Sequence, residues 1–307
     1  MPNAQSPTPT HDVCALGCVC WDYVGIVGEY PDLDEKALLT ELLQMGGGLS
    51  GTAMSAVAAL GGRAKIFGRM GDDDFGRHIL AAFEREGVDA SGLEVLPGIT
   101  SQFAFCVAHA STGRRTIFWK PGTYRRMVEG EVDLAALTDC RALLVDHHHL
   151  RAATEAARYA RGLGLPVVGD IERLQPGADD FLAAVTHPII PRGFVRELTG
   201  EQNLRAGVRR LQDRGVELVI VTQGEEGVTA FVGAEELHQP AFAVTPVVDT
   251  TGAGDVFHGA FTYGLALGYE LAENLRFAGA AAALSCRALG GRGALPTMAE
   301  VQALLGA

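Results

Sequence analysis

The feature that most constrains the fold of this chain is the heptapeptide Asp249–Asp255, which reads DTTGAGD. It follows an extended apolar run and opens an apolar segment from Val256 to Leu267, so it lies where a loop becomes a helix. Gly252 and Gly254 allow a tight turn that presents several amides to one point at the positive end of the helix dipole. Asp255 then falls in the first helical turn. An anion cradle with a carboxylate at its rim suits phosphoryl transfer to a hydroxyl; the alternative is a glycine-rich turn with a capping aspartate.

Several weaker motifs stand in a fixed order around this heptapeptide. Gly46-Gly47-Gly48 opens a run of small residues, the segments IFGRMGDDDFGRHIL and REGVDASGLEV follow, and VTQGEEG precedes the heptapeptide. In this order and spacing, the chain from about Val13 to Pro296 resembles the PfkB/ribokinase family of carbohydrate kinases. The resemblance implies a ribokinase-like three-layer α/β/α fold with a mostly parallel central sheet and a small β-sheet lid. It also implies ATP-dependent phosphorylation of a primary hydroxyl of a sugar or sugar derivative.

The resemblance also implies roles for individual residues. Asp255 would accept the proton of the attacking hydroxyl, and the amides of Gly252, Ala253 and Gly254 would hold the γ-phosphoryl oxygens. The substrate-binding residues expected on the acceptor side are Asp22, Gly47, Gly48, Thr52, Lys36, Trp119 and His148. Those expected to bind the nucleotide are Thr222, Gly224, Gly227, Thr250, Ala283 and Cys286. Mg²⁺ would accompany ATP, and a K⁺ ion, if one is used, would bind around Asp249, Thr251, Ala288 and Gly291.

The chain departs from the family pattern at three places. Thr52 stands where the family usually has an asparagine beyond the two glycines, so an amide is replaced by a hydroxyl. Pro191 and Phe194 stand in place of the Asn and Glu of an N-x-x-E motif, and neither can ligate Mg²⁺. The segment Asp170–Arg173 reads D-I-E-R where the family has D-x-N-R. Phosphates, water and other carboxylates would then hold the metal.

The coarse pattern alternates strands and helices, which predicts a parallel sheet covered on both faces. The expected elements after residue 140 are strands at 143–146, 166–170, 188–191 and 217–222, and helices at 151–163, 179–185 and 203–214. Residues 23–27 and 101–120 carry strand patterns without crossover helices, and predict a small antiparallel sheet. We therefore expect a disordered tail at 1–11 and one kinase domain at 12–307, with a lid formed by about 23–45 and 98–121. By resemblance, the lid would also form a homodimer interface.

Composition limits the partners. A net charge of −12 argues against nucleic acid, which favours basic surfaces. No apolar run reaches the roughly 18 residues of a membrane span, and residues 1–11 lack the apolar core of a signal peptide. We expect a cytoplasmic protein whose partners are a small sugar substrate and ATP.

Two clusters suggest metal binding at first sight. Cys14, Cys18 and Cys20 lie near the first strand, but no second pair of ligands accompanies them, so small buried thiols are favoured over zinc. His147–His149 follow a strand at the sheet edge where ligands bind in open α/β folds. Strand residues alternate sides, so the three histidines cannot all face one ion. Substrate-edge histidines and a solvated strand terminus remain equal alternatives.

Other nucleotide-binding folds fit less well. Gly46-x-Gly48-x-x-Gly51 matches the dinucleotide fingerprint, but the segment before it has weak strand character, and no P-loop motif occurs. A nucleoside kinase of the same fold would need an aromatic platform, which Trp119 or Phe103 could supply. A sugar- or nucleotide-binding regulator that has lost catalysis is the third possibility. K⁺ dependence and the acceptor stay open.

Within the kinase interpretation, MGGG followed by threonine, HQPAF and GGRGALP resemble the sulfofructose kinase branch. Lys36 and His148 could then meet an anionic group on the acceptor, with Arg115 or Arg292 as further candidates. A ketose or a sugar acid is also compatible.

Overall fold

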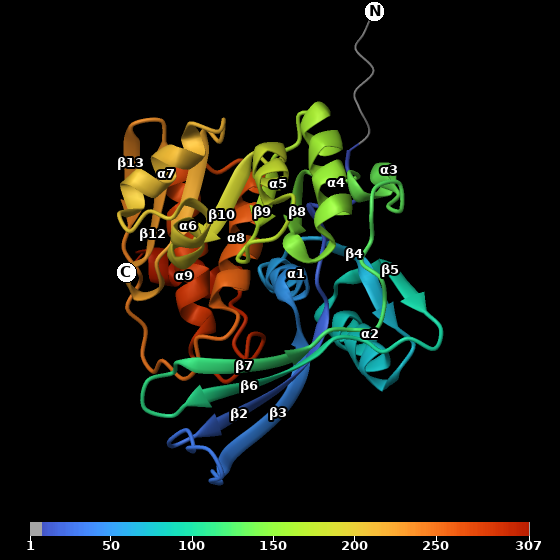
Figure 1. The fold of residues 1–307 in the computed structure, drawn as a ribbon, viewed down its shortest axis with the longest axis vertical. Helices are drawn as coiled ribbons and strands as arrows, with labels where there is room; N and C mark the ends of the chain where they lie inside the picture. Colours follow the sequence, from blue (N-terminus) through green and yellow to red (C-terminus); the bar gives the residue numbers. More distant parts are fainter. Residues whose placement is uncertain (1–7, 307) are drawn as a thin grey trace, which may run out of the picture.

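The computed structural model describes residues 8–306, and its core is one nine-stranded sheet between two helical layers (Figure 1). The strand order is β13-β12-β11-β10-β9-β8-β1-β4-β5. The pairs from β11 to β5 are parallel, and β12 and β13 add an antiparallel edge. The strands are β1 Val13–Leu16, β4 Ala64–Gly71, β5 Asp89–Leu96, β8 Ala142–Asp146, β9 Val167–Asp170, β10 His187–Pro191, β11 Leu218–Thr222, β12 Val228–Val232 and β13 Glu235–Gln239.

Alternation of side chains along the buried strands creates two cores. In β8, Leu144 packs with one cluster, while Leu143 and Val145 point to the other. The first cluster is covered by α1 Leu49–Ala59, α2 Asp74–Glu86, α8 Ala253–Leu267, α9 Leu271–Ser285 and α10 Met298–Gly306. The second is covered by α3 Leu134–Leu137, α4 Leu150–Gly162, α5 Ala178–Ala184, α6 Arg192–Thr199 and α7 Leu204–Gln212. The predicted three-layer fold with a mostly parallel sheet is confirmed.

A second sheet of four strands lies beneath the carboxyl ends of the central strands (Figure 1). Its order is β3-β2-β6-β7, with β2 Cys20–Val27, β3 Leu39–Gly47, β6 Phe103–His109 and β7 Arg115–Lys120. Its inner face packs Cys20, Val24, Ala104 and Cys106 with Leu289 of the main domain.

The small sheet corrects two expectations. The prediction that it is wholly antiparallel is wrong, because β2 and β6 pair in parallel. Between them the chain forms β3 and then runs through α1, β4, α2 and β5 before it returns to the small sheet. Leu38–Met45, which has weak strand character in sequence, contributes most of β3, because pairing with β2 overrides its local preference. The first of the dinucleotide-like glycines, Gly46, therefore lies in a strand, but one that pairs antiparallel in the small sheet, outside any parallel βαβ unit.

Smaller differences concern boundaries. The predicted helices and strands after residue 140 fall within two residues of the observed ends, whereas α6, α9, α10, β12 and β13 were not predicted. Of the expected tail, residues 1–7 lie outside the described residues. Thr10 N donates to the Asp139 carboxylate at 3.0 Å and His11 N to the Asp139 carbonyl at 3.3 Å, so these two residues are held by the domain. Among residues 8–306, no helix has the length and apolar character needed to cross a membrane.

Candidate active site

A cleft of about 340 Å³ opens between the carboxyl ends of the central strands and the inner face of the small sheet. In open α/β sheets this edge is the usual ligand site. Nine of the site residues predicted from sequence line the cleft: Asp22, Gly48, Trp119, His148, Thr222, Thr251, Gly252, Gly254 and Asp255. Residues from the first strand of the lid and from the last third of the chain therefore meet in one place.

The amino end of α8 supplies the anion cradle. Gly252 caps this helix with a φ of +74°, and a Cβ there would lie 2.5 Å from the Cα of Gly291, so glycine is required. Ala253 N makes a long bond of 3.4 Å to the Thr250 carbonyl. Within the described residues, the amides of Gly254 and Asp255 have no backbone acceptor, so they are available to an anion at the helix terminus.

Asp249 ties this cradle to the segment near residue 290. Its Oδ1 accepts from Thr251 N at 2.8 Å and from the Thr251 hydroxyl at 2.7 Å, while Oδ2 accepts from Gly290 N at 2.8 Å. Asp249 is fully buried. Three charge-assisted hydrogen bonds to one buried carboxylate fix the loop on both sides of Gly252.

The lid turn closes over the same loop. Thr250 N and the Thr250 hydroxyl donate to the Gly113 carbonyl at 3.2 and 3.1 Å, and Arg115 Nη1 lies 3.4 Å from the Thr250 hydroxyl. The small sheet thus touches the cradle through Ser111–Gly113, the turn between β6 and β7.

Asp255 is partly buried in the first turn of α8. Burial raises its pKa well above the usual value for a carboxyl group, and the nearby Asp170 charge adds to this, while His258 and Arg115 oppose it. Burial also raises the pKa of Asp170, with Glu172 and Asp146 contributing. Two carboxylates facing one small space are a common arrangement for a group that exchanges protons during a reaction.

At the other end of the cleft, Asp22 lies on β2 with 9% of its surface exposed. Burial raises its pKa, while the Cys20 thiol and the Arg292 guanidinium oppose the shift. A Cβ on Gly47 would lie 2.0 Å from Asp22 Oδ2, and Gly48 has a φ of +86° with the Cys18 carbonyl 2.5 Å from its missing Cβ. The two glycines therefore make room for the carboxylate and the chain turn.

The histidine segment is an internal turn, so the solvated alternative is wrong. His147–His149 form a 3₁₀ turn after β8, and all three side chains are buried. His148 Nε2 lies 2.9 Å from the Tyr124 hydroxyl. Burial lowers the pKa of His148 well below its usual range and that of His149 to about 4, so both are neutral at physiological pH.

Asp146 is a residue whose importance the sequence did not reveal. Its Oδ2 accepts from Cys18 N at 2.7 Å and from the Ser50 hydroxyl at 2.7 Å, and its Oδ1 accepts from His148 N at 2.7 Å. It is fully buried and joins the ends of β1 and β8 to the start of α1. The sequence did offer one indication of this role, since Asp146 stands at the end of an apolar strand.

Cationic side chains at the cleft come from three segments. Arg115 lies on β7, Arg126 donates to the His148 carbonyl, and the Arg173 guanidinium stacks 4.8 Å from the centre of the Trp119 ring. Arg126 and Arg173 were not singled out, because both lie in loops whose position depends on the tertiary fold.

Several predicted residues lie away from the cleft lining. Lys36 is exposed in the loop between β2 and β3, and Thr52 is buried inside α1, facing Gly291. The residues expected at the nucleotide that do not line the cleft are Gly224, Gly227, Thr250, Ala283 and Cys286. Ala253, Gly47, Asp249, Ala288 and Gly291 also lie outside its lining.

The predicted metal ligands remain untested by the geometry. The loop around Asp249 and the segment 288–291 do come together, as the Gly290 bond shows. Within the described residues, no group of three His, Cys, Asp or Glu side chains is arranged to hold a metal ion. All six cysteines are buried free thiols, as expected. Pro191 lines the cleft and Phe194 is buried in the core, so neither offers a ligand.

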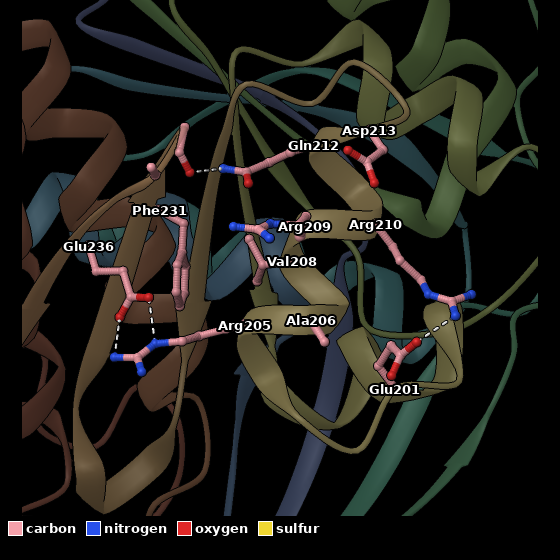
Figure 2. Close-up of a pocket in the computed structure, with 12 residues that line it drawn as sticks. Glu201, Arg205, Ala206, Val208, Arg209, Arg210, Gln212, Asp213, Phe231 and Glu236 are labelled. Carbon is pink, nitrogen blue, oxygen red and sulfur yellow. Dashed lines mark hydrogen bonds and ion pairs between the residues drawn. The ribbon is translucent and has the colours of Figure 1, made fainter.

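A second cavity, of about 410 Å³, lies on the far side of the sheet between α7 and the β12–β13 hairpin (Figure 2). Two of the arginines that line it are engaged: Arg205 pairs with Glu236 at 2.6 Å, and Arg210 pairs with Glu201. Although larger, this cavity holds none of the residues that the motifs identify, so the cleft beside α8 is the candidate site.

Fold and cleft together define a class of protein: a three-layer α/β protein in which a helix amino terminus and an aspartate face a cleft that a small sheet covers. Residues 10–298 match the model of the pfkB family carbohydrate kinases, and the chain belongs to this family. The predicted family and enzyme class, an ATP-dependent sugar kinase, are confirmed.

Individual relatives are distant in sequence but similar over nearly their whole length. The ribokinase of Bacillus subtilis is 28% identical over 303 residues, which cover 96% of this chain and 99% of that protein. A solved structure of a putative ribokinase from Agrobacterium tumefaciens has a TM-score of 0.86 at 30% identity, covering 96% of this chain and 98% of that one. The ribokinase of Arabidopsis thaliana, solved in complex with ribose and ATP, shares the fold with a TM-score of 0.80 at 23% identity, covering 96% and 98%.

Proposed function

We propose that this enzyme transfers the γ-phosphoryl group of ATP to a primary hydroxyl of a sugar derivative held between Asp22 and Asp255. The observation that carries the proposal is that both carboxylates line one cleft, with the open amides of α8 beside Asp255. The end of the cleft at the α8 amides suits phosphate oxygens, and the end at Asp22 suits hydroxyl groups.

The reaction follows from this placement. The acceptor hydroxyl oxygen forms a bond to the γ-phosphorus, the bond from that phosphorus to the bridging oxygen of ADP breaks, and Asp255 takes the hydroxyl proton. The raised pKa of Asp255 makes it a stronger base than an exposed aspartate. The amides of Gly254 and its neighbours stabilise charge on the transferring group.

The acceptor pocket favours several hydroxyl groups together with an acidic substituent. The Gln102 Oε1 and His147 Nδ1 atoms are buried without a partner among the described residues, and both side chains line the cleft. Donor hydroxyls of a sugar would satisfy them. Arg126 and Arg173 provide cations at the cleft, Arg173 with its Nε 3.9 Å from Glu172, and they support a sulfonated or carboxylated sugar such as sulfofructose or a sugar acid.

The other cationic candidates are less suitable for this substituent. His148 is neutral through burial, and Arg292 is engaged by Glu86 at 2.8 Å. Lys36 lies in the exposed lid loop.

A nucleoside acceptor is disfavoured by the two aromatic candidates. The Trp119 ring is already stacked by Arg173 at 4.8 Å, and Phe103 packs on Phe75 of α2 at 5.2 Å. Both rings therefore already have a stacking or packing partner, which a nucleobase would have to displace or share.

ATP is the proposed donor, with Mg²⁺ bound through its phosphates and water. Pro191 and Phe194 offer no oxygen side chain, so the family's usual protein support for Mg²⁺ is absent at these described positions. When bound, the ion would neutralise phosphate charge. A K⁺ ion near Asp249, Thr251, Ala288 and Gly291 would stabilise the loop beside the cradle.

The outer face of the lid supports the proposal of a homodimer. Leu42 on β3 and Phe118 on β7 are 52% and 63% exposed on this small sheet. Apolar exposure of this kind is typical of protein interfaces. The six free thiols support a reducing compartment, and we propose the cytoplasm.

The test is ADP release from MgATP with a panel of acceptors: ribose, fructose, fructose phosphates, sulfofructose, 2-keto-3-deoxygluconate and adenosine. Wild type should be stimulated by an acidic sugar, and Asp255→Asn should be slower by about 10² to 10⁴. Asp74→Asn is the matched control, because Asp74 also lies in the first turn of a helix but is exposed and away from the cleft.

Tight ATP binding without stimulation by any acceptor would favour a binding-only regulator. Stimulation by adenosine alone would show that the pocket accepts a base despite the stacked arginine. Equal activity of the Asp255 and Asp74 variants would overturn the assigned base.

A further inference from the structure

The segment 289–292, which follows α9, contacts both the small sheet and the phosphate cradle. Leu289 is buried against the apolar inner face of the small sheet. The next residue, Gly290, donates its backbone N–H to Asp249 Oδ2 at 2.8 Å. The backbone of this segment therefore holds the loop that forms the cradle.

The side chain of Arg292 extends from the same segment to the acceptor end of the cleft. It is almost fully buried, and its Nη1 pairs with Glu86 of α2 at 2.8 Å. Its Nη2 donates to the carbonyl oxygen of Gly47 at 3.0 Å. Gly47 is the residue that leaves room for the Asp22 carboxylate. One side chain thus connects the cradle segment to the turn beside the proposed acceptor site.

The glycines of the Gly46-x-Gly48-x-x-Gly51 pattern make room for this guanidinium. A Cβ on Gly46 would overlap Arg292 Nη1, and a Cβ on Gly51 would lie 2.8 Å from Nη2. Gly48, between them, has a φ of +86°, which glycine adopts without strain. The pattern that resembles a dinucleotide fingerprint therefore surrounds a cation of the chain itself.

We propose that Arg292 is a positioning residue that lies among these three glycines and holds Gly47 in register with the phosphate cradle. The inference rests on the proposed kinase function for its catalytic consequence, but the placement of the guanidinium can be tested without any acceptor. The backbone of Gly290 holds the cradle, whereas the side chain of Arg292 holds Gly47. Loss of the side-chain contacts should therefore loosen the acceptor end and leave the nucleotide end in place.

The first experiment is a double-mutant cycle in urea unfolding. In the wild-type background, Gly51→Ala should lower the urea midpoint, because the new methyl group displaces a buried guanidinium. In the Arg292→Met background the side chain ends short of the Nη positions. The same Gly51→Ala change should there leave the midpoint unchanged or raise it, because alanine is more favourable than glycine inside a helix.

Gly162→Ala is the matched control for this cycle. Gly162 also lies in a helix, α4, and a Cβ there would meet open space. The control should shift the midpoint equally in both backgrounds. If Gly51→Ala also shifts it equally in both, the glycine does not make room for the guanidinium and the proposal is overturned.

The second experiment measures the steady-state kinetics of Arg292→Lys with the acceptor that most stimulates the wild type. Lysine keeps the charge, but its single ammonium cannot reproduce the forked contact with Glu86 and Gly47. KM for the acceptor should rise about tenfold, while KM for ATP and kcat stay within about twofold. Arg205→Lys, which changes a forked but exposed pair with Glu236 on the far side of the sheet, should keep all three constants.

The pattern of constants separates a positioning role from a structural one. A fall in kcat with both KM values unchanged would indicate only a loss of folded enzyme and would refute the positioning role. An equal rise in KM for ATP would show that Arg292 supports the whole cleft and would also overturn the proposal. If no acceptor stimulates the wild type, the proposed function fails, and the catalytic consequence with it. The urea cycle then decides the placement of the guanidinium independently.

Discussion

Replacing Arg292 with methionine should destabilise the protein more than any change to its surface ion pairs. The Arg292 side chain is 3% exposed; its Nη1 pairs with Glu86 at 2.8 Å, and its Nη2 donates to the Gly47 carbonyl at 3.0 Å. The guanidinium also lies 5.0 Å from the centre of the Phe83 ring. One cation thus links the C-terminal segment to α2 and to the glycines beside Asp22.

The magnitude follows from these contacts. Removing one partner of a buried ion pair costs about 3–5 kcal/mol, because it strands the other charge. Glu86 is 25% exposed and can regain water, so we expect the lower end, about 3 kcal/mol. For a chain of this size, each kcal/mol lowers Tm by about 2 °C, which gives a fall of about 6 °C. KM for the acceptor should also rise, since Gly47 loses a partner.

Urea and thermal unfolding at pH 7.5 measure the effect. Arg287→Met is the matched control, because Arg287 pairs with Glu300 at 2.9 Å while 35% exposed, and should lose less than about 1 kcal/mol. Adding Glu86→Gln to Arg292→Met should recover part of the loss, because no unpaired carboxylate then remains. If Arg292→Met unfolds like the Arg287 control, the buried pair does not stabilise this fold as argued.

Three further variants test other parts of the structure. Asp73→Ala should cost about 1–2 kcal/mol in urea unfolding, because Asp73 caps α2 and accepts from the Ser101 hydroxyl at 2.6 Å; an unchanged midpoint would contradict this. Gly252→Ala should reduce kcat/KM at least tenfold, since a Cβ would meet Gly291 at 2.5 Å, and full activity would show that the cradle can shift. Burial lowers the pKa of His187 to about 4 against the ordinary 6.5, so the unfolded chain binds the extra proton and stability is lost as the pH falls from 6.5 to 4. His187→Gln should reduce that slope by about 1 kcal/mol per pH unit, and parallel stability curves would refute the assignment.

The site could be predicted from sequence only where local chemistry identifies it. DTTGAGD predicts a cradle at a helix start, and Gly252 does cap α8. Asp22 and Asp255 share a cleft although they are 233 positions apart, and their pairing was expected from family resemblance rather than from periodicity. Thr52 and Lys36 were expected at the acceptor by the same route and lie outside the cleft lining.

Long-range placement explains the residues that were missed. Asp146 reads as a strand end in sequence, and its bonds to Cys18 and Ser50 arise from crossovers that bring three segments together. Arg126 and Arg173 lie in loops, where no local period indicates which side chain faces a ligand. The contact of the His258 ring with the Ile189 carbonyl joins α8 to a strand that lies 69 residues earlier in the chain.

The sequence by itself determined the alternation of strands and helices, the helix-start motif with its aspartate in the first turn, and the family, because these depend on neighbouring residues and short spacings. Only the tertiary structure decided that β2 and β6 pair in parallel, since that pairing follows a long excursion of the chain through two helices and three strands. It also decided which charges are buried together. Burial sets the pKa of Asp255 and the state of the histidines, and burial belongs to the assembled fold rather than to any segment.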